Sequence, residues 1–217
     1  MTINPVRNII HLLNQISEYI KSQIKGKLQM SIYHYTKGYS VEGILKDGYI
    51  NLEGTSGRSL VKPKKAFVWF TEKQSYPISA LPMVAQLPYT HMQNYFGIAC
   101  PTINWIELSK VIGGVFRFEF SKKDSRVEKW SKCAFRAKSG ATRYYQMLEK
   151  TANLVGDYAN KFWIAHEAMQ LKNCTLQIFV SGEWINLLRF NNEGFVEQLS
   201  NYTLDDVIEI CKDRLCA

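Results

Sequence analysis

The sequence has little cysteine, and its five cysteines are scattered at Cys100, Cys133, Cys174, Cys211 and Cys216. None forms a C-x-x-C pair, and an odd number argues against a framework of disulfides. The sequence also lacks the H-x-x-H and H-E-x-x-H spacings that are typical of histidine–metal enzymes. We therefore expect a cytoplasmic protein of a reducing compartment, with no metal cofactor.

No hydrophobic run approaches the ~18 apolar residues of a membrane span, so we expect no membrane-spanning segment. Residues 1–5 lack the basic start and apolar core of a signal peptide. With 217 residues and 46% hydrophobic residues, the chain can build one domain with a large core. Apolar residues at helical spacing predict an amphipathic helix within residues 1–28, and the domain itself is expected over residues 29–217.

Positive charge is concentrated in the first third of the chain. The net charge is +8, and residues 1–75 hold eleven Lys and Arg against five Asp and Glu. Four of these cations cluster in one segment, at Arg58, Lys62, Lys64 and Lys65. The cluster suits a solvated loop, a clamp on a diphosphate, or a surface for nucleic acid, and charge alone does not choose among them.

The most informative stretch is IYHYTKGYSVEGILKDGYI, residues 32–50. It predicts a strand that ends in His34-Tyr35-Thr36, then a helix with an apolar face, then a stop at Gly48. Residues 66–71, AFVWFT, predict a second strand, which leads toward a helix near Ser79-Ala80. A polar histidine at the end of a core strand is typical of a functional site.

Later segments predict an α+β domain with mostly antiparallel strands. Phenylalanines alternate in residues 112–120, which predicts a strand, and residues 144–154 predict a helix. Two more strand segments, KFWIAHEAMQL and CTLQIFVSGEWINLLRF, follow, the second with a hairpin turn at Ser181-Gly182. Thr203 and Asp206 predict the capped start of a last helix.

This order of motifs resembles the ADP-ribosyltransferase superfamily, in its diphtheria-toxin and poly(ADP-ribose) polymerase branch. The matching residues are His34-Tyr35-Thr36, Ile44-Leu45 with Gly48-Tyr49, the Val-Trp-Phe-Thr of residues 68–71, and Ser79-Ala80. The likeness covers residues 31–80. Tyr35 stands where the family has a small residue, Trp69 where it has a stacking tyrosine, and Thr71 where it has alanine. The resemblance implies two packed sheets that form an NAD cleft, with terminal helices.

The resemblance also implies roles for particular residues, with NAD as the substrate. His34 and Thr36 would hold the adenosine-side ribose, and Tyr49 and Trp69 would stack on the nicotinamide. Arg58 would bind the diphosphate, and Ser79 would complete the NAD-binding set. Without the resemblance, His34 suits a core-edge histidine bonded to backbone, and Trp69 suits a residue that covers the sheet.

Glu167 is the expected catalytic carboxylate, because the family's glutamate opens a late strand and an acidic residue within an apolar stretch is costly to bury. The rivals are Glu183 and Glu119, and an exposed Glu167 paired with Arg143 is the plain structural alternative. The sequence has no Glu-x-Glu or Gln-x-Glu pair, so the target preference of the arginine-modifying toxins is not supported.

The expected function is transfer of ADP-ribose from NAD to a protein or nucleic acid, through an oxocarbenium-like transition state. The alternatives are an RNA 2′-phosphotransferase-like enzyme, an NAD glycohydrolase, and a non-catalytic module that binds a nucleotide or a protein. In the last case Trp69 and Tyr35 would fill the cleft. A likeness to uncharacterised bacterial and phage proteins leaves a toxin and a phage effector both open.

Overall fold

The computed structural model describes residues 31–52, 66–77, 79, 114–134, 142–180 and 182–213. The chain divides into two compact units, residues 1–31 and 32–217, and the described residues other than Ser31 all belong to the second. Two predicted features lie outside the described residues: the helix within residues 1–28 and the basic cluster with Arg58.

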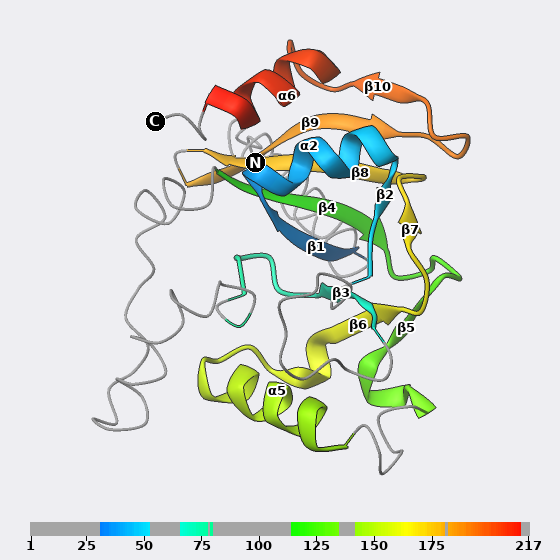
Figure 1. The fold of residues 1–217 in the computed structure, drawn as a ribbon, viewed down its shortest axis with the longest axis vertical. Coiled ribbons are helices and arrows are strands. Elements are labelled where there is room, and N and C mark those ends of the chain that lie inside the picture. Colours follow the sequence, from blue (N-terminus) through cyan, green and yellow to red (C-terminus); the bar gives the residue numbers. More distant parts are fainter. Residues whose placement is uncertain are drawn as a thin grey trace, which may run out of the picture. The chain divides into compact units, whose positions relative to one another are not determined.

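The described strands form one large sheet and one small sheet (Figure 1). The large sheet has the order β10-β9-β8-β4-β1-β3-β6-β5, and β2 pairs with β7 in a two-stranded ribbon. Each of the pairings β1–β3, β3–β6, β5–β6, β4–β8, β8–β9, β9–β10 and β2–β7 is antiparallel. The α+β, mostly antiparallel class expected from the sequence is therefore confirmed. The bounds are β1 (Ser31–Lys37), β2 (Tyr49–Ile50), β3 (Val68–Thr71), β4 (Val115–Ser121), β5 (Val127–Lys129), β6 (Phe162–Ala165), β7 (Met169–Gln170), β8 (Cys174–Val180), β9 (Glu183–Phe190) and β10 (Val196–Gln198).

Three α-helices are described, α2 (Gly38–Asp47), α5 (Thr142–Leu154) and α6 (Leu204–Asp213), with short 3₁₀ turns η2 (Trp130–Lys132) and η4 (Ala159–Lys161). As predicted, α2 ends at Gly48, which has φ 71° and donates its N–H to the Ile44 carbonyl. The predicted cap of α6 is also present. The backbone N–H of Thr203 donates to Asp206 at 2.6 Å, and the backbone N–H of Asp206 donates to the Thr203 hydroxyl at 3.1 Å. None of the helices in the described ranges is long and apolar enough to cross a membrane.

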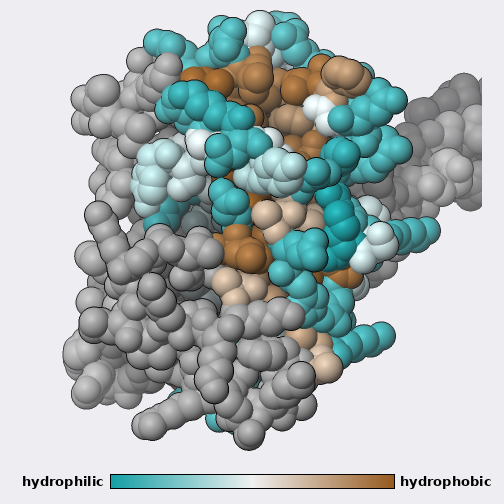
Figure 2. All heavy atoms as spheres, turned by 45° about the vertical axis from the view of Figure 1, so that its right-hand side comes forward, coloured by the Kyte–Doolittle hydropathy of each residue, from teal (hydrophilic) through white to brown (hydrophobic). Residues whose placement is uncertain are grey.

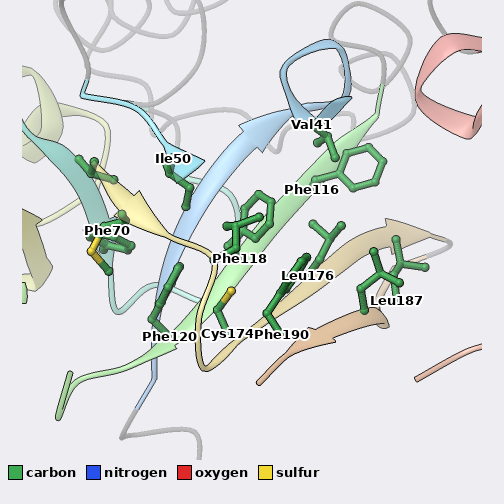
Figure 3. Close-up of a cluster of buried hydrophobic side chains, with 14 of the residues drawn as sticks. Val41, Ile50, Phe70, Phe116, Phe118, Phe120, Cys174, Leu176, Leu187 and Phe190 are labelled. Atoms are coloured by element: carbon green, nitrogen blue, oxygen red, sulfur yellow. The ribbon is translucent and has the colours of Figure 1, made fainter. Parts of the chain in front are cut away.

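The larger core covers one face of the sheet. Phe116, Phe118 and Phe120 alternate along β4 and point to the same side (Figure 3). They meet Val41 of α2 and Ile50 of the β2–β7 ribbon. The alternating phenylalanines predicted for this strand therefore face the core. Seen from outside, hydrophobic residues still show between hydrophilic ones (Figure 2), as on most folded domains.

A second, smaller core lies on the opposite face, where α5 packs. It joins Phe67 from beside β3, Ile164 of β6 and Tyr145 of α5 with Trp130 and Cys133. Successive residues of a strand point to opposite faces, so β3 contributes Val68 and Phe70 to the larger core and Trp69 to the smaller one.

Candidate functional site

His34 lies in the middle of β1 with its ring on the side of the larger core. The ring meets Phe70 edge-on with centroids 5.9 Å apart, and Nδ1 lies 2.9 Å from the Trp69 carbonyl oxygen. Because a carbonyl only accepts hydrogen bonds, the imidazole proton sits on Nδ1 and leaves Nε2 as an acceptor. Burial lowers the pKa of His34 to about 4, although the bond to Trp69 acts in the opposite direction. The ring is therefore neutral near pH 7.

Trp69 does not face His34 with its indole. The indole packs against Trp130, Phe67, Tyr145 and Phe162, with ring centroids 5.0–6.2 Å apart. Those rings belong to the smaller core, on the other face of the sheet from the His34 ring. The structure therefore corrects the expectation that His34 and Trp69 line one cleft. The two residues meet through the Trp69 backbone, because alternation along β3 turns the indole away.

The other predicted NAD-binding residues are spread over the fold. Thr36 is buried on the His34 side of β1. Tyr49 is exposed on β2, and its hydroxyl accepts a hydrogen bond from Gln170 of β7. The backbone N–H of Ser79 donates to Asp157 at 2.7 Å. Arg58 lies outside the described residues.

Glu167 is exposed, in the turn between β6 and β7. It follows the end of β6 at Ala165 and does not open a strand, because β7 begins only at Met169. The His34 ring contacts Phe70 of β3, and Phe70 pairs with Trp163 of β6. Glu167 comes four residues after Trp163, beyond the end of β6. The structure therefore does not bring Glu167 to His34. Of its rivals, Glu183 is an exposed residue at the start of β9.

Glu119 is the one of the three carboxylates whose described bonds connect it to a buried polar network. Its Oε2 accepts a hydrogen bond from Gln177 Nε2 at 3.1 Å. Gln177 also donates to Asn186 at 2.6 Å and accepts from Arg117 Nε at 2.5 Å. Arg117 and Glu119 lie two residues apart on β4, on the face opposite the phenylalanines, with Cα atoms about 7 Å apart.

Arg117 is the centre of this network, and we name its side chain with Tyr33, Tyr35, Gln177 and Trp184 the Arg117 cluster. Arg117 is only 4% exposed, and its guanidinium lies over two rings, 4.0 Å from the Tyr33 centroid and 3.9 Å from that of Trp184. Its Nη1 donates to the Gln74 carbonyl at 2.6 Å and to the Tyr35 hydroxyl at 3.2 Å. Within the described residues, these acceptors and Gln177 are all neutral groups.

Tyr35 is fixed in the cluster by both ring and hydroxyl. Its ring meets Tyr76 and Trp184 edge-on, and its hydroxyl donates to the Lys73 carbonyl at 2.7 Å. Burial raises the pKa of Tyr35 well above its usual range, although Arg117 nearby acts to lower it. The phenol therefore stays protonated and serves as a donor at neutral pH.

A buried carboxylate fastens the neighbouring segment. Asp157 is 2% exposed, accepts from the Lys73 ammonium at 2.5 Å, and accepts the Ser79 backbone N–H. It thereby ties the residues that follow β3 to the end of α5. The bond from Ser79 to Asp157 thus helps to hold this segment in place, which the predicted role of Ser79 in NAD binding did not include.

Sequence reasoning did not single out Arg117, although a signal was present. An arginine and a glutamate alternate with three phenylalanines in VFRFEF, residues 115–120, so both must share the face away from the core. The partners Gln177, Tyr35 and Trp184 come from other strands and could not be identified from the spacing.

No family model, curated protein or solved structure matches this chain. Among the described residues, a surface hollow of about 500 Å³ lies along α5, where Gln146, Glu149, Lys150, Asn153 and Leu154 line it. None of the predicted site residues lines it. The Arg117 cluster and the carboxylate of Glu119 are therefore the arrangement on which a functional proposal rests.

Proposed function

We propose that this chain transfers ADP-ribose from NAD to a macromolecular acceptor, with its site on the sheet face that carries the Arg117 cluster. The observation that carries the proposal is the buried guanidinium of Arg117, which lies over two aromatic rings and bonds to neutral acceptors among the described residues. A buried positive charge without a carboxylate partner is costly, and an anionic ligand such as a diphosphate would offset that cost.

The residue types on this face suit the chemistry that the family resemblance implies. In the reaction the bond between nicotinamide and ribose breaks, and nicotinamide leaves with the bonding electrons. A nucleophile of the acceptor then bonds to the ribose carbon and loses its proton. Glu119 would stabilise the cationic ribose and receive that proton, while Arg117 would stabilise the diphosphate. This assignment replaces Glu167 by Glu119, because only the latter has a described bond to the buried network.

A second candidate is a non-catalytic module that binds a nucleotide on the same face. It is favoured by the position of Glu167 in an exposed turn beyond β6 and by the packing of the Trp69 indole against the smaller core. Under this alternative the aromatic rings and Arg117 bind the ligand, and no carboxylate takes part in chemistry.

Turnover of labelled NAD separates these possibilities. The full chain is incubated with NAD labelled in the adenylate part, alone and with cell lysate. Labelled macromolecule and free nicotinamide are expected, and nicotinamide without labelled macromolecule would indicate a glycohydrolase instead.

Glu119→Gln should lower kcat by about 10²–10³, with NAD affinity retained, because the charge acts when the ribose becomes cationic. Glu167→Gln is the matched control and should stay within a few fold of the parent.

The binding part of the proposal has its own control. Arg117→Lys keeps the charge but loses the planar fork, so NAD affinity measured by calorimetry should fall about tenfold or more. Arg189→Lys, at an exposed arginine, should leave it unchanged. NAD binding without turnover would support the module. Absence of both, in a folded protein, would refute the proposal, and an inactive Glu167→Gln with an active Glu119→Gln would return catalysis to Glu167.

A further inference from the structure

Three side chains of metal-binding type converge at the edge of the smaller core. Glu128 comes from β5, Cys133 follows η2, and His166 follows β6. One possible ligand atom from each of the three residues lies within 4.8 Å of the others. Their spacing along the chain matches no zinc motif, so only the pairing of β5 with β6 brings them together.

His166 carries an observation that is independent of this convergence. Its Nε2 contacts the carboxylate of Glu128. Its Nδ1 is buried and has no hydrogen-bond partner in the described part of the chain. Buried ring nitrogens are nearly always bonded, so the unpaired Nδ1 marks a ring whose hydrogen bonds are not satisfied within the described residues. The two ring nitrogens point away from each other, so an ion shared with Glu128 would bind Nε2.

The surroundings suit a metal centre. Cys133 is 4% exposed in the smaller core, and the Phe67 ring lies 5.3 Å from that of His166. Glu128 is on the open side, with 40% of its side chain exposed, which gives an ion access from solvent. An apolar wall with one accessible carboxylate is a common setting for a site that keeps an open coordination position.

We propose that Cys133, His166 and Glu128 form a binding site for Zn²⁺ or a similar borderline divalent metal. Thiolate, imidazole and carboxylate are the ligands that zinc takes, and three protein ligands leave a fourth position for water. Zinc bonds of about 2.0–2.3 Å in a tetrahedron place ligand atoms about 3.5 Å apart. The most distant pair of ligand atoms must therefore close by about 1 Å, while His166 Nε2 and the Glu128 carboxylate, which are in contact, must move apart to admit the ion. Rotation of the partly exposed Glu128 side chain and of the His166 ring supplies both movements. Binding releases the Cys133 thiol proton to solvent.

This site is separate from the Arg117 cluster and does not rest on the proposed function. The test uses the full chain, stripped with a chelator and titrated with Zn²⁺ by calorimetry and with Co²⁺ by absorption spectroscopy. We expect about one ion per chain, and a thiolate-to-cobalt charge-transfer band, because a coordinating thiol is deprotonated. Cys133→Ser should abolish the band, and Glu128→Gln should weaken Zn²⁺ affinity about tenfold or more.

Cys174→Ser is the matched control. Cys174 is also buried, but it does not belong to the group of converging metal-binding side chains, so its replacement should leave the cobalt band unchanged. If Cys133→Ser fails to fold, Glu128→Gln decides, because its exposed residue tolerates substitution. A parent protein that takes up no Zn²⁺, a cobalt spectrum without the thiolate band, a band that persists in Cys133→Ser, or unchanged affinity in Glu128→Gln would each overturn the proposal.

Discussion

Two neighbouring residues of β1, His34 and Tyr35, face opposite sides of the sheet and contact different partners. His34 points to the larger core, and its buried ring stays neutral. Tyr35 points to the other side, where its hydroxyl lies 3.2 Å from the Arg117 guanidinium. Within the His-Tyr-Thr motif, His34 therefore packs in the core, whereas Tyr35 belongs to the proposed site. A ligand bound at that site would contact Tyr35 and not His34.

The lowered pKa of His34 predicts a stability change with pH. Because its pKa falls from 6.5 to about 4 on folding, the unfolded chain takes up this proton first as the pH drops. The contribution of His34 is fully present above pH ~6.5 and is lost as the pH falls, with a loss of about 3 kcal/mol at pH 4. His34→Asn keeps an N–H for the Trp69 carbonyl but does not titrate. Urea unfolding measured at pH 7 and at pH 4.5 should therefore show a smaller loss of unfolding free energy for His34→Asn than for the parent.

The comparison of His34→Asn with the parent removes the effect of other groups, since the carboxylates titrate equally in both. Equal losses of unfolding free energy over this pH range would show that the His34 pKa is not lowered by folding.

At the scale of single elements, a glycine inside α2 and the glycine that caps its C-terminus have opposite requirements. Gly48 ends the helix at φ 71°, where L side chains are strained, whereas Gly43 lies inside the helix with a negative φ. An added Cβ would meet nothing within 4 Å at either position, so only backbone conformation differs. Gly48→Ala should cost about 1–2 kcal/mol of unfolding free energy. Gly43→Ala should add about 0.5–1 kcal/mol.

Chemical denaturation of both variants measures these values, and each is the control for the other. Stabilisation by Gly48→Ala would mean that α2 continues past Asp47. Destabilisation by Gly43→Ala would mean that the helix interior does not tolerate a methyl group there.

At the scale of the whole molecule, the two cores share the same strands. β3 sends Phe70 to the larger core and Trp69 to the smaller one, and β6 likewise sends Ala165 and Ile164 to opposite faces. Neither core can open without disturbing this sheet, so we expect both to unfold together. Hydrogen exchange in rising denaturant should give the amides of Phe118 and Ile164 the same opening free energy.

Phe67→Ala sharpens this test, because Phe67 belongs only to the smaller core. The substitution should cost about 3–5 kcal/mol and lower the opening free energy of both amides equally. An effect confined to Ile164 would show that the smaller core unfolds by itself.

Much of the local structure followed from the sequence alone. The strand that contains His34-Tyr35-Thr36, the helix that stops at Gly48, the alternation along β4 and the Thr203–Asp206 cap were all predicted and are present, although β1 continues to Lys37. Each depends on neighbours within a few residues, through backbone conformation, side-chain period or a local hydrogen bond. The mostly antiparallel α+β class followed from the same signals.

The sites depended on tertiary structure, because strand order and register are set by contacts between distant segments. The sequence showed that Arg117 and Glu119 face away from the core, but their partners meet them only through the strand order. Gln177 of β8 and Tyr35 of β1 come from the two strands that flank β4, and Trp184 comes from β9, the strand beyond β8. The same pairing rules separate the Trp69 indole from His34 and place Cys133 beside His166. The sequence by itself thus determined the local structure of segments with a strong local signal, although the segment predicted as one strand around Glu167 is divided into β6 and β7. Only the fold decided which side chains meet, since that requires the register between strands.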